Sequence, residues 1–257
     1  MDTRIIAIVN QKGGVGKSTT AEALAAGLFL KGFSCLAIDL DAQCNFSYTM
    51  GARTDGSTAL GLLTGEVEAD TAIQTIDGLD VIAASKALAG ADAFITDTGK
   101  EYRLKEALEG IKKRYDYIII DTPPALGILT VNALTACDKA IIPAQADIYS
   151  LQGIEQLAET IQPVKKYCNP SLRIDGILLT RYNSRSVLSR EVAELTEQLA
   201  AKLGTKLYKA TIREAIAVKE AQISQKDLFK YAPTAKVTED YRAFIEEFLE
   251  DDIEERS

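Results

Sequence analysis

Residues 5–28 read IIAIVNQKGGVGKSTTAEALAAGL, an apolar run followed by a glycine-rich loop and a helical pattern. A strand, a loop and a helix in this order form a phosphate-binding loop, in which backbone N–H groups and the positive end of the helix surround an anion. The usual pattern is G-x-x-x-x-G-K-[ST], and residues 16–18 complete its second half. Its first glycine is replaced by Gln11, and a second lysine, Lys12, follows. The sequence therefore predicts a phosphate site with an additional cation.

Each group in this loop has a predicted role. The glycines let the backbone turn its N–H groups toward the anion, Lys17 can reach the β- and γ-phosphates of a nucleotide, and the Ser18 hydroxyl can bind Mg²⁺. One alternative is a plain glycine-rich turn before a helix. Another is a dinucleotide fingerprint, which fits less well because Thr19 stands where a third small residue belongs, although Asp39 lies near the place of a ribose-binding acid. The predicted nucleotide-binding residues of this segment are Lys12, Gly13, Gly14, Val15, Gly16, Lys17, Ser18 and Thr19.

Short apolar runs alternate with helical patterns along the chain, which predicts an α/β fold: a doubly wound, mostly parallel sheet with helices on both faces. The predicted strands are 5–10, 34–39, 79–83, 117–121, 140–143, 174–180 and 206–210, and the predicted helices are 18–31, 101–114, 151–167, 188–203 and 236–249. We expect one domain over residues 1–257, with the acidic C-terminal helix and tail (236–257) as part of it and no N-terminal DNA-reading module. Ligands of such sheets bind at the carboxyl ends of the strands, where the loops 10–19, 39–49 and 121–128 carry polar side chains.

Composition narrows the chemistry. Histidine is absent, so catalysis has to use carboxylates, lysines, hydroxyls and backbone amides, and most zinc enzymes are excluded. The four cysteines (Cys35, Cys44, Cys137 and Cys168) are widely spaced and predict reduced thiols. No apolar run reaches the ~18 residues of a membrane span and no signal peptide is recognisable, so a cytoplasmic protein is expected.

The net charge of −8 is concentrated at the end of the chain. Residues 239–257 hold nine acidic side chains and two arginines, whereas the other 238 residues hold 28 acidic and 27 basic ones. A nearly neutral body can carry a local basic face, so the overall acidity does not exclude DNA binding.

The segment KGGVGKST (12–19) resembles the deviant Walker A signature of the ParA/MinD-type P-loop ATPases, and NQKGGVGKST (10–19) is most similar to the ParA (Soj-like) partition branch. This resemblance implies that Lys12 crosses a dimer interface and contacts the phosphates bound by the other subunit. Two copies of the chain would then enclose two ATP molecules. A second ammonium group would offset triphosphate charge best where a partner excludes water.

The segment AIDLDAQCNFSYTMG (37–51) resembles switch I of this family, D-x-D-P-Q-x-N, with matches at Asp39, Asp41, Gln43 and Asn45. The resemblance implies that Asp41 orients or activates the attacking water. The alternative interpretation is that Asp41 is an ordinary turn residue at a strand end. Ala42 replaces the proline of the pattern and Cys44 replaces its glycine, and we expect both changes to affect the stiffness of the loop and the turnover rate.

The segment YDYIIIDTPPALG (115–127) is a buried strand that ends in an acid, Asp121. A carboxylate at this place can hold Mg²⁺, usually through a water molecule. The prolines that follow predict a rigid turn, and the DTPP sequence resembles switch II of the family. The predicted metal-binding residues are Ser18, Asp41 and Asp121, the predicted catalytic residues are Lys12, Lys17 and Asp41, and Asp121 is also counted among the nucleotide-site residues.

The last third of the chain resembles the family less closely. Residues 213–215, Arg-Glu-Ala, replace the Pro-Arg-Asn of the family's base-contacting segment, so Arg213 is the one nucleotide contact expected there. Family members bind DNA without sequence preference through a few basic side chains, which would give a salt-dependent affinity. Alternatively, the basic side chains in this part of the sequence are ordinary surface charges. The predicted DNA-binding residues are Arg185, Lys219, Lys226 and Lys230.

These features predict a ParA-type partition ATPase that uses ATP and Mg²⁺, forms a homodimer, binds double-stranded DNA on the nucleoid and is stimulated by a ParB-like centromere-binding partner. The alternative is a MinD-like membrane ATPase; the acidic helix with Tyr241, Phe244, Ile245, Phe248 and Leu249 on one face instead predicts packing on the core and no membrane partner. A nitrogenase-iron-protein type would need a second cluster ligand besides Cys137, and a tyrosine-kinase relative would need a tyrosine-rich tail.

Overall fold

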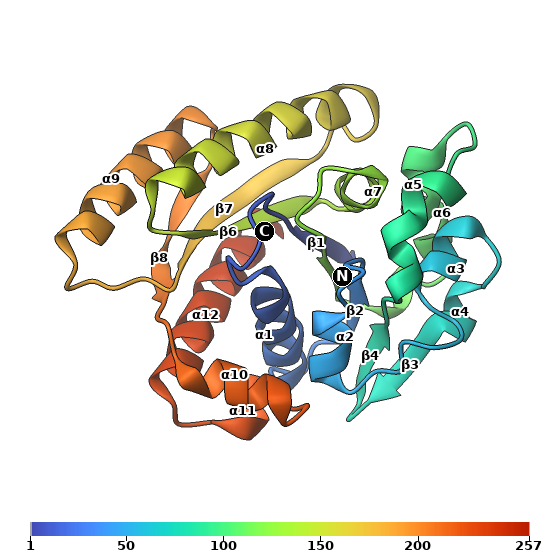
Figure 1. The fold of residues 1–257 in the computed structure, drawn as a ribbon, viewed down its shortest axis with the longest axis horizontal. Helices are drawn as coiled ribbons and strands as arrows, with labels where there is room; N and C mark the ends of the chain where they lie inside the picture. Colours follow the sequence, from blue (N-terminus) through green and yellow to red (C-terminus); the bar gives the residue numbers. More distant parts are fainter. Residues whose placement is uncertain (1, 257) are drawn as a thin grey trace.

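The computed structural model describes residues 2–256 and contains an eight-stranded sheet in the order β3-β4-β2-β5-β1-β6-β7-β8 (Figure 1). Every neighbouring pair is parallel except β3 with β4. The predicted doubly wound α/β fold is therefore confirmed. The strands are β1 (Arg4–Ile8), β2 (Cys35–Asp39), β3 (Ile73–Ile76), β4 (Leu79–Ile82), β5 (Tyr117–Asp121), β6 (Lys139–Gln145), β7 (Arg173–Thr180) and β8 (Lys206–Ile212).

Helices cover both faces of this sheet (Figure 1). Successive residues of β1 point to opposite faces: Ile6 and Ile8 join the hydrophobic cluster of α1 and α12, and Ile5 and Ala7 join that of α7 and α8. The α-helices are α1 (Lys17–Leu30), α2 (Asn45–Met50), α3 (Ala59–Thr64), α4 (Ala69–Ala72), α5 (Ala91–Phe94), α6 (Arg103–Leu108), α7 (Ile128–Ala136), α8 (Ile148–Tyr167), α9 (Val187–Lys202), α10 (Ile216–Ile223), α11 (Leu228–Tyr231) and α12 (Lys236–Arg256). The 3₁₀ helices are η1 (Lys86–Gly90), η2 (Lys100–Tyr102) and η3 (Lys112–Arg114).

The helix predicted over 101–114 is wrong as a continuous element, because the structure divides this stretch into η2, α6 and η3. Its apolar residues Leu104, Leu108 and Ile111 nevertheless lie in one core cluster. The apolar spacing was therefore a sound guide to burial. Gly110, a poor helix former, lies where the helix is interrupted.

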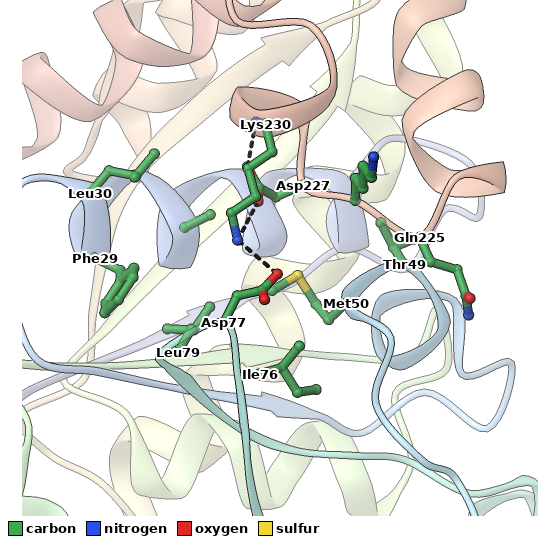
Figure 2. A pocket seen from close by; sticks show the side chains of 12 residues that line it. Phe29, Leu30, Thr49, Met50, Ile76, Asp77, Leu79, Gln225, Asp227 and Lys230 are labelled. Atoms are coloured by element: carbon green, nitrogen blue, oxygen red, sulfur yellow. Dashed lines mark hydrogen bonds and ion pairs between the residues drawn. The ribbon is translucent and has the colours of Figure 1, made fainter.

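Strand β3 was not predicted, although the chain carries a signal for it. Asp77 and Gly78 connect β3 to β4 with φ angles of 50° and 90°. A two-residue Asp-Gly connection with both residues in the left-handed region is a favoured β-hairpin turn. The Asp77 carboxylate also accepts a hydrogen bond from Lys230 of α11 at 2.9 Å, so the hairpin contacts the far end of the chain (Figure 2).

Helix α12 packs as its apolar spacing predicts, with the side chains of Tyr241, Phe244, Ile245, Phe248 and Leu249 all buried. A Cβ added to Gly27 of α1 would lie 2.2 Å from Cδ1 of Ile245, so the two helices approach closely. The helix continues to Arg256, past the predicted end at Leu249. Within residues 2–256, none of the helices combines the length and the apolar character that a bilayer crossing requires.

The central strands bring the polar loops together. Asp121 at the end of β5 lies opposite Ile8 of β1 on one side and opposite Asp39 of β2 on the other. The loop that follows β1 leads directly into α1. The phosphate loop and two of the predicted acids therefore meet at the carboxyl edge of the sheet, where parallel α/β sheets bind their ligands.

Candidate nucleotide site

The glycine-rich loop has the backbone shape of an anion site. Gly14 and Gly16 have φ angles of 74° and 87°, which glycine adopts without the clash that a side chain would cause. Helix α1 starts at Lys17, and no side chain caps its first N–H groups. These N–H groups, together with the positive end of the helix, are available to a phosphate.

Two strand ends hold the loop from outside. The side-chain amide of Gln145, at the end of β6, donates a hydrogen bond to the Gly14 carbonyl at 3.0 Å. The hydroxyl of Thr180, at the end of β7, donates to the Val15 carbonyl at 2.7 Å. These two hydrogen bonds therefore restrain the backbone of the loop at Gly14 and Val15.

A cavity of about 560 Å³ opens in front of the loop. Lys17 lies at its wall, is 6% exposed, and its Nζ is 3.3 Å from the carbonyl oxygen of Lys12. Burial lowers the pKa of the Lys17 ammonium, and the carboxylates of Asp121 and Asp41 oppose that shift. The cavity is lined by Gly13, Gly14, Gly16, Lys17, Ser18, Thr19, Asp41, Gln43, Asn45, Tyr48, Thr49, Pro124, Arg181, Lys219, Gln222 and Ile223.

Asp39 and Asp121 are both fully buried at the strand ends but differ in their partners. Asp39 accepts hydrogen bonds from the backbone N–H groups of Asp41 and Ser47 and from the Ser47 hydroxyl. Neither carboxylate oxygen of Asp121 accepts a well-aligned hydrogen bond from residues 2–256, although the Ser18 hydroxyl lies near enough to favour its charged form. Burial raises the pKa of Asp121 well above its ordinary value, and the neighbouring Asp39 raises it further.

An unpaired buried carboxylate beside a hydroxyl and a second acid fits a divalent cation. Oxygen ligands of this kind suit Mg²⁺, whose positive charge would replace the missing partner of Asp121. Ser18 and Asp41 both line the cavity, so they and Asp121 are the residues that could hold the metal.

Asp41 projects from a tight turn. It is 9% exposed, and one of its carboxylate oxygens accepts a hydrogen bond from the Gln43 N–H at 3.0 Å. Cys44 follows with a φ angle of 56°, in the left-handed region where the switch I pattern has glycine. A side chain in that region costs about 1–2 kcal/mol, so the replacement of glycine at this position strains the loop.

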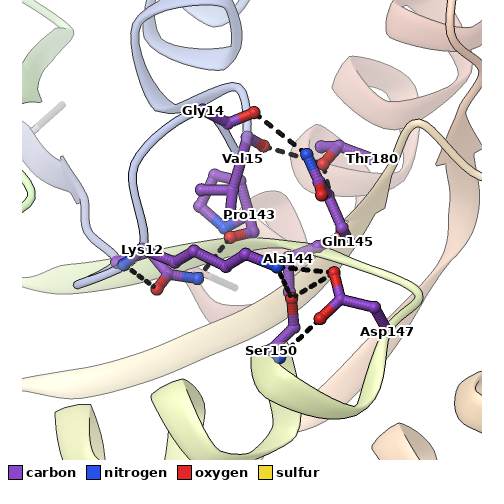
Figure 3. A network of polar contacts seen from close by, with 10 residues as sticks. Lys12, Gly14, Val15, Pro143, Ala144, Gln145, Asp147, Ser150 and Thr180 are labelled. Atoms are coloured by element: carbon purple, nitrogen blue, oxygen red, sulfur yellow. Dashed lines mark hydrogen bonds and ion pairs between the residues drawn. The ribbon is translucent and has the colours of Figure 1, made fainter.

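Lys12 points away from the loop to which it belongs. Its Nζ lies 2.6 Å from Oδ2 of Asp147 and 3.4 Å from the hydroxyl of Ser150, at the start of α8 (Figure 3). Burial raises the pKa of Asp147, but the hydrogen bonds from Lys12 and Ser150 outweigh it and leave that pKa below its ordinary value. In this state the ammonium group is paired within the chain, a partner that the sequence analysis missed.

The family to which the chain belongs follows from comparison with known proteins. Residues 3–174 match a family model described as an AAA domain. The chain is 40% identical over 243 residues to the sporulation initiation inhibitor protein Soj of Bacillus subtilis (strain 168), which covers 93% of this chain and 95% of Soj. It is 42% identical over 235 residues to the chromosome partitioning protein ParA of Caulobacter vibrioides (strain NA1000 / CB15N), with 89% and 87% covered. The chain belongs to the Soj/ParA family.

The chain is an ATPase, as the family model and the Soj and ParA relatives establish together. Among solved structures, cobyrinic acid a,c-diamide synthase from Mycobacterium smegmatis with bound ADP and magnesium is 33% identical. It matches with a TM-score of 0.79 over 96% of this chain and 94% of its own.

The predicted nucleotide contact Arg213 is engaged elsewhere in this Soj/ParA chain. Its guanidinium group donates two hydrogen bonds to the Asp240 carboxylate of α12, at 2.6 and 2.7 Å. The residue still lines a second cavity of about 130 Å³, which shares Gly16, Thr19, Arg181, Lys219 and Gln222 with the phosphate cavity. Arg181, with a φ angle of 48°, was not singled out from the sequence.

The structure does not place the four predicted DNA-binding residues in one cluster. Lys219 lines both cavities of the nucleotide site. Lys226 and Lys230 line a separate small cavity with residues of α1 and of the β3–β4 hairpin. Lys230 is paired with Asp77 at 2.9 Å and with Asp227 at 3.5 Å (Figure 2). Arg185 lies exposed in the loop between β7 and α9. Their role in DNA binding stays a prediction.

Sequence signals existed for some of the missed site residues. Thr180 ends a predicted strand, where a polar residue faces the ligand edge. Asp147 precedes α8 and Ser150 lies three residues later, a spacing typical of a helix N-cap. The pairing of Asp147 with Lys12 had no such signal, because 135 positions separate the two residues.

Proposed function

We propose that this Soj/ParA family ATPase is a DNA-partition protein that works as a nucleotide-dependent homodimer. Residues 1–257 act as one ATPase domain in the cytoplasm. ATP and Mg²⁺ bring two copies together, the dimer binds nucleoid DNA without sequence preference, and a ParB-like centromere-binding partner stimulates hydrolysis and releases it.

The residues of the loop would bind and orient the nucleotide. The N–H groups of residues 13–19 and the Lys17 ammonium surround the phosphates, and Ser18, Asp41 and Asp121 hold Mg²⁺, which supplies positive charge to the triphosphate when bound. Asp41 accepts a proton from, or orients, the attacking water. The solved cobyrinic acid a,c-diamide synthase with a bound ATP analogue and magnesium supports this choice of cofactors.

The observation that carries the proposal is the direction of Lys12. Its side chain leaves its own phosphate loop and is 31% exposed, and the residue does not line the cavity in front of that loop. An ammonium group so placed is better suited to the triphosphate of a second copy than to its own. Lys12 would have to exchange the Asp147 carboxylate for a phosphate, so dimer formation would depend on ATP.

The proposal is tested with the Asp41→Ala chain, in which hydrolysis is expected to be blocked. Light scattering should show dimers with Mg²⁺-ATP but monomers with ADP, and mixed-sequence duplex DNA should co-sediment only with the ATP form. Adding Lys12→Ala should leave ATP bound while removing both the dimer and the DNA binding.

Arg185→Glu should weaken DNA binding about tenfold and spare the dimer, because it reverses one phosphate contact. Arg53→Glu is the matched control, since Arg53 is exposed and lies near the opposite edge of the sheet. DNA binding that is equal in all nucleotide states would contradict the proposal. Binding to anionic vesicles in place of DNA would favour the membrane alternative.

A further inference from the structure

The hydroxyl of Ser47 joins two parts of the molecule behind the nucleotide site. It lies in α2, and it connects the Asp39 carboxylate at the end of β2 to the backbone just after β4. We propose that Ser47 is a positioning residue for ATP hydrolysis, which fixes Asp41 through Asp39. This inference rests on the proposed role of Asp41.

The hydrogen bonds form one continuous chain. The N–H group of Ala84 donates to the Ser47 hydroxyl at 2.9 Å, and that hydroxyl donates to Oδ2 of Asp39 at 2.6 Å. The Ser47 N–H donates to the same oxygen at 2.9 Å. The other oxygen of Asp39 accepts from the Asp41 N–H at 2.9 Å. The position of the Asp41 backbone is thus tied to the end of β4.

All residues in this series of hydrogen bonds except Asp41 are inaccessible to solvent. Ser47, Asp39 and Ala84 each have an exposed fraction of 0%. A buried N–H group that loses its acceptor, or a buried carboxylate that loses a donor, is costly unless the backbone moves to find another partner. Removing the hydroxyl would do both at once, so the loop between Asp39 and Ser47 would shift.

This loop needs an external restraint. It contains the strained Cys44, and α2 begins directly after it without a side-chain cap. Strained residues persist where the surrounding structure holds them in place. The Asp39–Ser47–Ala84 hydrogen bonds provide that restraint, and none of these three residues lines the cavity.

Removal of the Ser47 hydroxyl should lower the turnover rate and leave nucleotide binding unchanged. The phosphate loop has its own supports in Gln145 and Thr180, which do not involve Ser47. Asp41 would remain in the site but be displaced from the water that it orients. A misplacement of a catalytic group by about 1 Å can lower rates by about a hundredfold.

The test compares the steady-state ATPase kinetics of Ser47→Ala, Ser47→Thr and Thr196→Val. Thr196 is the matched control because its hydroxyl is also buried, but it donates to the Val192 carbonyl within α9, away from the site. We expect Ser47→Ala to lower kcat at least about tenfold, with KM for ATP within about threefold and ATP-dependent dimers retained. Ser47→Thr keeps the hydroxyl and should recover most of the rate, and Thr196→Val should match the wild-type protein.

A kcat of Ser47→Ala within about twofold of wild type would overturn the proposal, as would a Ser47→Thr variant that is equally slow. If Ser47→Ala fails to fold by circular dichroism, Ser47→Cys, which keeps the shape but donates weakly, decides by the same criterion. Asp41→Ala is assayed alongside. Normal turnover in Asp41→Ala would refute the proposed role of Asp41 itself, whereas an inactive Asp41→Ala with a wild-type Ser47→Ala refutes only the positioning role of Ser47.

Discussion

The buried charges at the two ends of the central sheet differ in their ion pairing within the protein. At the carboxyl end, Asp121 is fully buried and forms no ion pair with a side chain of residues 2–256, although Lys17 lies near enough to favour its charged form. At the amino end, the Lys139 side chain is 3% exposed, and its Nζ lies 2.9 to 3.3 Å from the carboxylates of Glu255, Asp175 and Asp252.

This difference shows at which end of the sheet the protein itself supplies the opposite charges for a buried group. A buried charge is costly unless it is paired, and at the amino end the pairing is supplied by α12 and β7. Burial by itself lowers the pKa of Lys139, but the three carboxylates outweigh it and keep that pKa above its ordinary value. At the carboxyl end the Lys17 ammonium only partly offsets the rise in the pKa of Asp121, so a ligand that brings further positive charge would be favoured there.

We expect the largest change in the free energy of unfolding from a substitution at the amino end of the sheet. Lys139→Met keeps the length of the side chain but leaves Asp175, Asp252 and Glu255 without their shared cation. We expect the free energy of unfolding at pH 7 to fall by about 3–5 kcal/mol, as measured by urea denaturation. The exposed Lys113→Met is the control and should change it by less than about 0.5 kcal/mol. Equal stability of the two variants would show that the cluster does not secure α12.

The next effect should have the opposite sign and concerns the carboxyl end. Asp121→Asn replaces a buried carboxylate by a neutral group of the same size. A carboxyl whose folded pKa is raised above its unfolded value destabilises the fold once the pH is high enough to ionise it. Without nucleotide, the variant should therefore be more stable than the wild-type protein at pH 8, by about 1–3 kcal/mol.

The same linkage predicts how this gain depends on pH. Because burial raises the pKa of Asp121 in the folded chain, the folded wild-type protein binds this proton more readily than the unfolded chain does, so the advantage of Asp121→Asn should shrink as the pH falls from 8 to 5. The difference in stability between Asp121→Asn and the wild-type protein is measured by thermal unfolding of both proteins at pH 8 and pH 5. A variant that is less stable than wild type at pH 8 would break the contrast between the two ends of the sheet.

The smallest effect concerns the ion pair of Lys12. Asp147→Asn removes the charge that holds the ammonium group in the single chain, while the amide can still cap α8. Because both side chains are about one-third exposed, the pair contributes at most about 1 kcal/mol. ATP-dependent dimers should therefore form with an affinity two- to fivefold higher, as measured by analytical ultracentrifugation. Weaker dimers would mean that Asp147 supports the dimer and does not compete with it.

The fold was predictable because its signals are local. The apolar runs of β1, β2 and β5 lie between glycine-rich or acidic turns. All seven predicted strands are present, β5 with the predicted bounds and the other six with one or both ends shifted. Strand β3 was missed because its residues are only partly buried and lack a continuous apolar pattern. The break in the helix predicted over 101–114 was missed because apolar spacing reports burial and does not report helix continuity.

The sequence by itself determined the phosphate loop, the strand-end acids and the family, because each is a short pattern whose chemistry depends on neighbours in the chain. Only the tertiary structure decided which distant groups meet: Lys12 with Asp147, Arg213 with Asp240, and Ser47 between Asp39 and Ala84. The physical reason is that an ion pair or a buried hydrogen bond forms wherever packing brings two groups within about 3 Å, and packing is set by the whole sheet and its helices.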